Sequence, residues 1–99
     1  MFEMKRNKPV VCADGFRMSV QAGEDLYCTP RIDNAVRYQS VEVGFPSSKE
    51  ELLIDYAEPI TGTVYPYVPV SVVSLVIAKH GGMVEGEVPP GVPELRAVS

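Results

Sequence analysis

The chain has 99 residues, 45% of them hydrophobic and 22% charged, which is typical of one folded domain with a single core. No apolar run approaches the roughly 20 residues of a membrane span, and no signal-type apolar segment follows the start "MFEMKRNK", so a cytosolic protein without a membrane segment is expected. The net charge is −4, and it is unevenly spread: residues 41–99 carry three Lys/Arg against eight Asp/Glu, or −5, so direct nucleic-acid binding is not expected.

Residues 1–8 are expected to form a loose N-terminal arm, and a β-hairpin is predicted next, around Asp14-Gly15. This dipeptide favours a two-residue type I′ turn, and alternating segments flank it. Such a turn pairs Val11 with Met18 and gives the hairpin one core-facing side. That side comprises Val11, Ala13, Phe16, Met18 and Val20, whereas Cys12, Arg17, Ser19 and Gln21 lie on the other face.

The middle of the chain predicts a loop, a strand and a short helix. Residues 22–37 lack periodicity and indicate a long loop, with a possible short strand around "DLYC". "YQSVEVGF" alternates and predicts a third strand with Gln39, Val41, Val43 and Phe45 on one face. "PSSKEELLIDYAE" predicts a helix of about two turns, because Ser and Glu are spaced as in a capping box. Its caps would be Ser47 or Ser48 with Glu50 or Glu51, and Leu52, Leu53 and Tyr56 would face inward.

The last third of the domain predicts an edge segment and the main helix. Pro66 confines "GTVYPYVP" to an edge strand or a loop, because proline lacks an amide donor. "PVSVVSLVIAKHGG" can begin a helix at Pro69 and end it at Gly81. Its β-branched residues make a strand the alternative. The helix would bury Val72, Val73, Val76, Ile77 and His80.

These elements predict a small two-layer α+β domain. The sheet would have three or four mainly antiparallel strands, packed against one main and one short helix. "MVEGEV" could add an edge strand. The domain would span residues 9–88, and the Pro-rich residues 89–99 would form a C-terminal tail.

The residues that most often carry chemistry do not form a catalytic pattern. Cys12 and Cys28 are the only cysteines and His80 is the only histidine. A zinc site needs about four nitrogen or sulfur ligands, so we predict neither a metal nor a cofactor. Both cysteines are expected to be free structural thiols, although a disulfide is an alternative. We expect no enzymatic activity, and His80 is interpreted as a packed residue or as a cation at the helix end.

Two segments are candidates for protein binding. Glu51, Asp55 and Glu58 are spaced to form one exposed acidic face of an α-helix, which suits a basic partner surface. Tyr65 and Tyr67 lie beside prolines, and tyrosine is enriched at interface hot spots. A proline-stiffened segment also loses little entropy on binding. We favour the tyrosine segment, because exposed charge pairs contribute at most about 1 kcal/mol each.

Six segments together carry a family resemblance: "MKRNKPVVCADGFRMSVQA", "YCTPR", "VEVGFPS", "YAEP", "TVYPYVPVSVV" and "IAKHGG". In this order they resemble a family of small proteins of uncharacterised activity encoded by bacteriophages and prophages. The resemblance spans roughly residues 4–88. It implies a phage genome and the cytoplasm of a bacterial host, and it assigns no functional residue.

The expected function is therefore that of a small phage accessory protein that binds a host or phage protein. Inhibition of a host defence system, as by an anti-CRISPR protein, is one form that this function could take. A head accessory or decoration protein in the virion is the first alternative. A small enzyme completed by a partner is the second.

Overall fold

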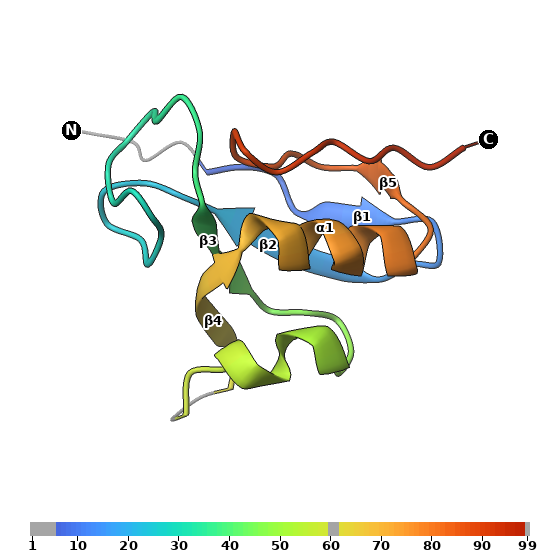
Figure 1. The fold of residues 1–99 in the computed structure, drawn as a ribbon. Coiled ribbons are helices and arrows are strands. Elements are labelled where there is room, and N and C mark those ends of the chain that lie inside the picture. The colour runs from blue at the N-terminus through green and yellow to red at the C-terminus, as the bar shows by residue number, and fades with distance from the viewer. Residues whose placement is uncertain (1–5, 60–61, 99) are drawn as a thin grey trace.

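The computed structural model describes residues 6–59 and 62–98 and contains one five-stranded antiparallel sheet with two helices (Figure 1). The strand order is β4-β3-β2-β1-β5. The predicted α+β class is confirmed, with one strand more than the highest number expected. The elements are β1 (Val10–Cys12), β2 (Arg17–Gln21), β3 (Ser40–Gly44), the 3₁₀ helix η1 (Glu51–Tyr56), β4 (Val64–Pro69), α1 (Val70–Lys79) and β5 (Met83–Glu85).

The turn between β1 and β2 differs from the predicted two-residue turn. The amide of Gly15 donates to the carbonyl of Cys12 at 2.9 Å, and the amide of Cys12 donates to the carbonyl of Phe16 at 2.8 Å. These two bonds close a three-residue loop in which Gly15 has φ +94°. A Gly in the left-handed region completes this type of loop. Asp14 stabilises it by accepting from the Phe16 amide through Oδ1 at 2.9 Å.

The extra loop residue changes the side of β1 that faces the core. Val10, rather than Val11, pairs with Met18. Because side chains alternate along a strand, a shift of one residue exchanges the two faces. Val10 and Cys12 are therefore buried, whereas Val11 is half-buried and Ala13 is exposed, so the predicted face of β1 is wrong. The predicted core positions on β2, which include Met18, are confirmed.

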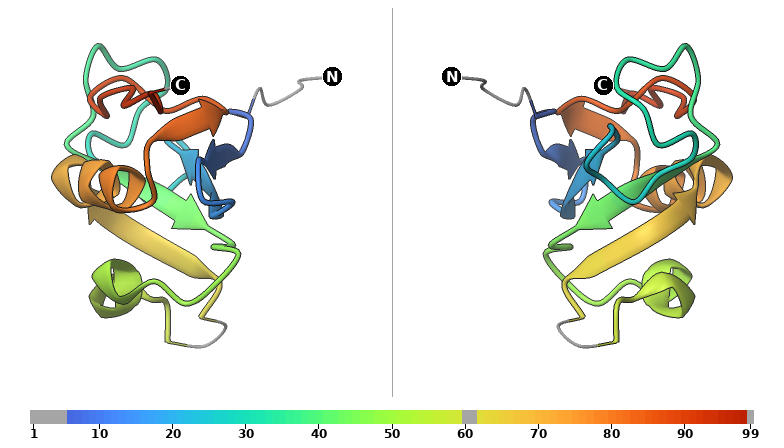
Figure 2. Two further views of the ribbon diagram at one scale, coloured as in Figure 1. Left: turned by 90° about the vertical axis from the view of Figure 1, so that its right-hand side faces the viewer. Right: turned by 90° about the vertical axis from the view of Figure 1, so that its left-hand side faces the viewer.

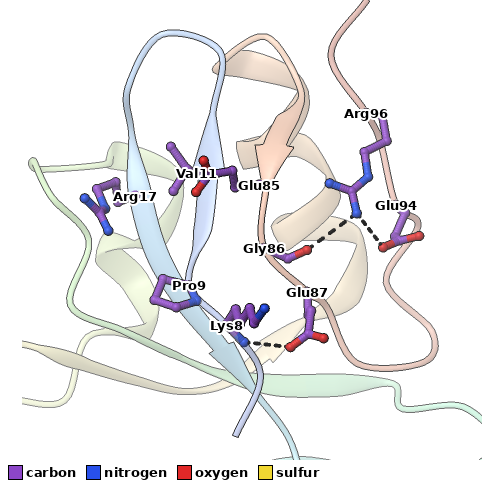
Figure 3. Close-up of a pocket in the computed structure, with 9 residues that line it drawn as sticks. All are labelled: Lys8, Pro9, Val11, Arg17, Glu85, Gly86, Glu87, Glu94 and Arg96. Atoms are coloured by element: carbon purple, nitrogen blue, oxygen red, sulfur yellow. Dashed lines mark hydrogen bonds and ion pairs between the residues drawn. The ribbon is translucent and has the colours of Figure 1, made fainter.

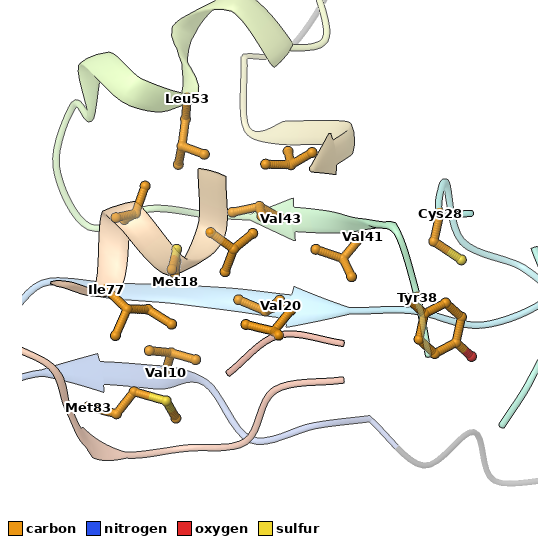
Figure 4. Packing of buried hydrophobic residues seen from close by; sticks show 14 of the residues in the cluster. Val10, Met18, Val20, Cys28, Tyr38, Val41, Val43, Leu53, Ile77 and Met83 are labelled. Atoms are coloured by element: carbon orange, nitrogen blue, oxygen red, sulfur yellow. The ribbon is translucent and has the colours of Figure 1, made fainter. Parts of the chain in front are cut away.

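The main helix matches its prediction, and the strand alternative is wrong. Val73, Val76 and Ile77 of α1 are fully buried. The helix starts after Pro69, which is its N-cap, and ends before Gly81, which has φ +91°. Figure 4 shows the core onto which this helix packs, with Tyr38 and Cys28 at the end opposite Leu53. The labelled members of this core also include Val10, Met18, Val20, Val41, Val43, Ile77 and Met83.

The short helix forms, but its type and its cap differ from the prediction. Glu50 is the N-cap, and its side chain accepts from the Leu52 amide at 2.9 Å. Ser47 instead pairs with Arg17, whose amide donates to Ser47 Oγ at 2.9 Å. The helix is of the 3₁₀ type, with three residues per turn. As a result Leu53 alone is buried, while Leu52 is partly exposed and Tyr56 is half-buried.

The connection between β2 and β3 is a loop, as predicted, and "DLYC" forms no strand in it. An isolated bridge joins Thr29 to Ser40 at the start of β3. At the other end of β3, Phe45 does not continue the buried face. It is 69% exposed with φ +50°, because the strand ends at Gly44.

Both termini contact the domain where the structure describes them. Residues 1–5 of the predicted arm lie outside the described residues, but the amide of Asn7 donates to Gln21 Oε1 at 2.8 Å. Residues 89–98 run back across the domain, first beside Tyr38, whose amide donates to the Pro90 carbonyl at 2.8 Å, and then along β5 (Figure 1 and Figure 2). The Met83 amide donates to the Leu95 carbonyl at 2.7 Å, and Val92 is buried. The predicted tail is thus part of the packed domain, attached by backbone bonds rather than by a periodic apolar pattern.

Candidate protein-binding surface

A β-bulge in the edge strand β4 places Tyr67 at the surface. β3 and β4 pair Val41 with Val68 and Val43 with Tyr65, so two residues of β4 oppose one residue of β3. The two residues are Pro66, which has no amide to donate, and Tyr67, which has φ +52°. The prediction that proline confines this segment to an edge is confirmed.

Tyr67 meets Tyr27, which lies in the long loop between β2 and β3. The Tyr67 amide donates to the Tyr27 carbonyl at 3.0 Å, and the two ring centroids are 5.9 Å apart. The guanidinium of Arg31 lies 5.0 Å from the centroid of the Tyr27 ring. Each tyrosine is 47% exposed. We call Tyr27, Arg31 and Tyr67 the tyrosine surface.

The loop that carries Tyr27 and Arg31 is held from inside by a buried tyrosine. The Tyr38 hydroxyl donates to the Ile32 carbonyl at 2.7 Å and accepts from the Ala35 amide at 3.3 Å. Tyr38 is only 2% exposed, whereas Ile32 and Val36 of the same loop are 52% and 96% exposed. Tyr38 therefore anchors the loop on its inner side, while Ile32, which follows Arg31 in the chain, and Val36 are apolar residues exposed on its outer side.

The structure separates the two tyrosines that the sequence analysis groups together. Tyr67 belongs to the tyrosine surface, whereas Tyr65 is half-buried and packs against the core. Tyr65 also lines a cavity of about 370 Å³ together with Phe45. Tyr27 is absent from the sequence-based candidates, because it lies in a segment without periodicity and no local pattern indicates its contact with β4.

The predicted acidic helix face is not formed. Glu51 and Asp55 are exposed on η1, but residues four apart in a 3₁₀ helix lie a third of a turn from each other. Glu58 lies after the helix, which ends at Tyr56, and it is half-buried. These three acids therefore do not share one helix face, as they would in an α-helix.

The two cysteines are buried free thiols, as expected. Burial, and then the charge of Asp14, raise the pKa of Cys12, which disfavours the reactive thiolate. The Cys28 thiol donates to the Gly23 carbonyl at 3.2 Å inside the loop. Both residues therefore have the surroundings of structural thiols.

A charged cluster around His80 is the main feature that the sequence analysis misses. Nδ1 of His80 lies 2.5 Å from Oδ2 of Asp14, and Nε2 lies 2.6 Å from Oε1 of Glu50. Nζ of Lys79 lies 2.8 Å from the other oxygen of Glu50. The Glu50 side chain is 1% exposed. The only sequence signal for this cluster is the cation at the helix end, since both acids are distant in sequence.

The cluster changes the pKa values of its members. Burial opposes ionisation of Glu50, but the hydrogen bonds from Lys79, the Leu52 amide and His80 together lower its pKa to about 2. The Phe16 amide, followed by His80, lowers the pKa of Asp14. Burial by itself would lower the pKa of His80, but its bonds to the two acids outweigh burial and raise it. The favoured state is an imidazolium between two carboxylates.

A cavity of about 630 Å³ lies over the side of β1 that faces away from the core (Figure 3). Charges of both signs line it. Arg96 pairs with Glu94 at 3.0 Å, and the Lys8 amide donates to Glu87 at 2.9 Å. This mixture gives the cavity no preference for an anion or a cation.

Neither a metal-binding cluster nor a membrane-spanning helix is found in the part of the chain that the structure describes. Within residues 6–59 and 62–98, no group of three His, Cys, Asp or Glu side chains is arranged to hold a metal ion. Across the same residues, no helix has the length and apolar character needed to cross a membrane.

Comparisons of the chain with protein-family models, with curated proteins and with solved structures found no match.

Proposed function

We propose that the chain acts by binding a protein partner through the tyrosine surface. The observation that carries this proposal is the exposed pairing of Tyr67 with Tyr27, next to Arg31. Tyrosine and arginine are the residue types most enriched at interface hot spots, together with tryptophan. Their rigid rings give contact area at a small entropic cost.

The bulge supports the same assignment. A bulky residue with positive φ is strained by about 1–3 kcal/mol, and such strain concentrates at functional sites. Here the bulge directs the Tyr67 ring outward, and the backbone bond to Tyr27 fixes it there. The surface is therefore arranged before the partner arrives, which lowers the entropic cost of binding.

The resemblance to phage-encoded proteins supports a protein of the bacterial host as the partner. Inhibition of a host defence system is the specific form of this function that we propose to test first. This assignment gives the chain no catalytic step and no cofactor. Its site of action would be the host cytoplasm, and recovery of the chain in purified virions would favour a particle component instead.

The test begins with affinity capture from a host lysate at physiological salt, followed by binding measurements on the purified partner. We expect Tyr67→Ala and Tyr27→Ala each to weaken binding by at least about 2 kcal/mol, or roughly thirtyfold, mainly through faster dissociation. Leu75→Ala is the matched control, because Leu75 is an exposed apolar residue on α1. It should leave the affinity unchanged. Each variant must first show the wild-type melting temperature.

A partner bound through the acidic residues of η1 would behave differently from one bound through the tyrosine surface. If Glu51 and Asp55 attract the partner, then Glu51→Lys with Asp55→Lys will slow association, and binding will weaken steeply with salt. Salt-sensitive binding that survives both tyrosine substitutions would refute the tyrosine surface as the binding site.

A further inference from the structure

Three separate segments of the chain meet at His80. His80 follows the last turn of α1, Asp14 lies in the turn between β1 and β2, and Glu50 caps η1. The imidazole is 15% exposed and stacks on the Phe16 ring, with the centroids 4.1 Å apart and the planes at 12°. The ring is therefore fixed between two acids from two different segments.

The geometry requires a protonated imidazole. A neutral imidazole has one N–H group and can donate to one of the two carboxylates only. Both ring nitrogens of His80 have a carboxylate oxygen within 2.6 Å. Both contacts can be hydrogen bonds only when His80 carries a positive charge.

The charges around the ring balance only in that state. Asp14 and Glu50 face it from the other elements, and Lys79 comes from its own helix. The remaining titratable neighbour is the thiol of Cys12, which the Asp14 charge affects. One lysine and one imidazolium neutralise two carboxylates, whereas loss of the imidazolium proton leaves one negative charge in excess.

We propose that Asp14, His80, Glu50 and Lys79 form a pH-sensitive latch that holds the β1–β2 turn against the end of α1 and releases it as the pH rises. The difference in burial between the two acids determines which contact of His80 breaks. The Glu50 side chain is only 1% exposed, whereas that of Asp14 is 51% exposed and can be hydrated. The single N–H group of a neutral imidazole therefore continues to donate to the Glu50 carboxylate, and water replaces it at the Asp14 carboxylate.

The direction of the pH dependence follows from the sign of each change. The His80 pKa is raised above its ordinary 6.5, so its contribution to stability is complete below 6.5 and is lost as the pH rises through the folded-state pKa. The Glu50 pKa is lowered from 4.5 to about 2, so its contribution is complete above 4.5 and is lost toward pH 2. The latch is therefore fully closed between about 4.5 and 6.5.

The first measurement is an NMR titration of the imidazole, which needs no assignment because the chain has one histidine. We expect the wild-type pKa to lie above 6.5. Asp14→Asn keeps an oxygen for the Phe16 amide but removes the charge, and it should lower the His80 pKa. Asp55→Asn, an exposed acid on η1 outside the latch, should leave the pKa unchanged. A wild-type His80 pKa of 6.5 or below would overturn the proposal.

The second measurement compares the free energy of unfolding of the wild type and His80→Gln from pH 6 to pH 9. The advantage of the wild type should shrink as the pH rises through the titrated pKa, because only the wild type loses a proton at residue 80. Protection of the Asp14 amide, which donates to the His80 carbonyl at 3.2 Å and so joins the turn to the end of α1, should fall in the wild type over the same range after correction for intrinsic exchange rates. An advantage that stays constant or grows with pH would show that the cluster is not a latch.

Discussion

Removal of one buried hydroxyl should loosen the loop that presents the tyrosine surface. Tyr38→Phe keeps the packed ring but deletes the group that donates to the Ile32 carbonyl and accepts from the Ala35 amide. The ring is 2% exposed, so it remains in the core in both proteins. Any change in stability therefore reports on the hydrogen bonds rather than on packing.

The size of the effect follows from the surroundings of the two partners. A hydrogen bond contributes about 0.5–1.5 kcal/mol net, and a buried group left without a partner costs about 1–3 kcal/mol. Ala35 is 8% exposed, so its amide loses its partner, whereas Ile32 is 52% exposed and water can reach it more easily. We expect a loss of about 1–3 kcal/mol, which lowers the melting temperature by at least about 4 °C in a domain of this size.

Thermal unfolding and amide exchange at Ala35 test this expectation together. The Ala35 amide should lose protection in Tyr38→Phe, while the amides of α1 keep theirs. Tyr27→Phe is the control, because it removes a hydroxyl from a tyrosine that is 47% exposed and should leave stability unchanged. A wild-type melting temperature with a fully protected Ala35 amide would refute the view that Tyr38 anchors the loop.

Two further substitutions test the fold. Gly91→Ala should weaken the docking of the C-terminal segment, because Gly91 has φ +106° and a Cβ there would lie 2.3 Å from the Tyr38 carbonyl oxygen. Faster proteolytic cleavage after Arg96 than in the wild type would show this weakening, and an unchanged cleavage rate would contradict it. Val73→Asp places a charge at a position that is 0% exposed and should cost about 3–5 kcal/mol in urea denaturation; an unchanged midpoint would mean that the buried face of α1 is misassigned.

The main helix is predictable from the sequence because its start, its period and its end agree. Pro69 precedes it, Val73 and Val76 recur at helical spacing, and Gly81 follows it. Each of these signals depends on residues close in the chain, so no distant contact is needed to interpret them.

The hairpin register is not predictable in the same way. Asp14-Gly15 is compatible with a two-residue turn and with a three-residue loop, and the choice exchanges the faces of β1. Contacts with residues 82 and 83, which are distant in the sequence, favour the longer loop. The amide of Ala13 donates to the Gly82 carbonyl at 2.9 Å, and Cys12 pairs with Met83. Local sequence carries no information on such distant partners.

The contacts within the candidate sites are even less predictable from the local sequence than the hairpin register. Pro66 reveals that β4 lies at an edge, but the contact of Tyr67 with Tyr27 depends on the path of a loop without periodicity. The His80 latch joins residues separated by 66 and 30 positions. Glu50 can be recognised as part of a capping pattern, but not as the partner of an imidazole.

The tyrosine at position 67 is better explained by the proposed binding role than by protection of the sheet edge alone. An exposed sheet edge invites pairing with another chain, and a bulge with a proline blocks it. Pro66 and the bulge already provide that protection in β4. Glycine or asparagine would adopt the left-handed backbone conformation at this position with less strain. A tyrosine at this position increases the strain and exposes 47% of a large ring. Edge protection does not explain this choice, whereas the protein contact that we propose would explain it.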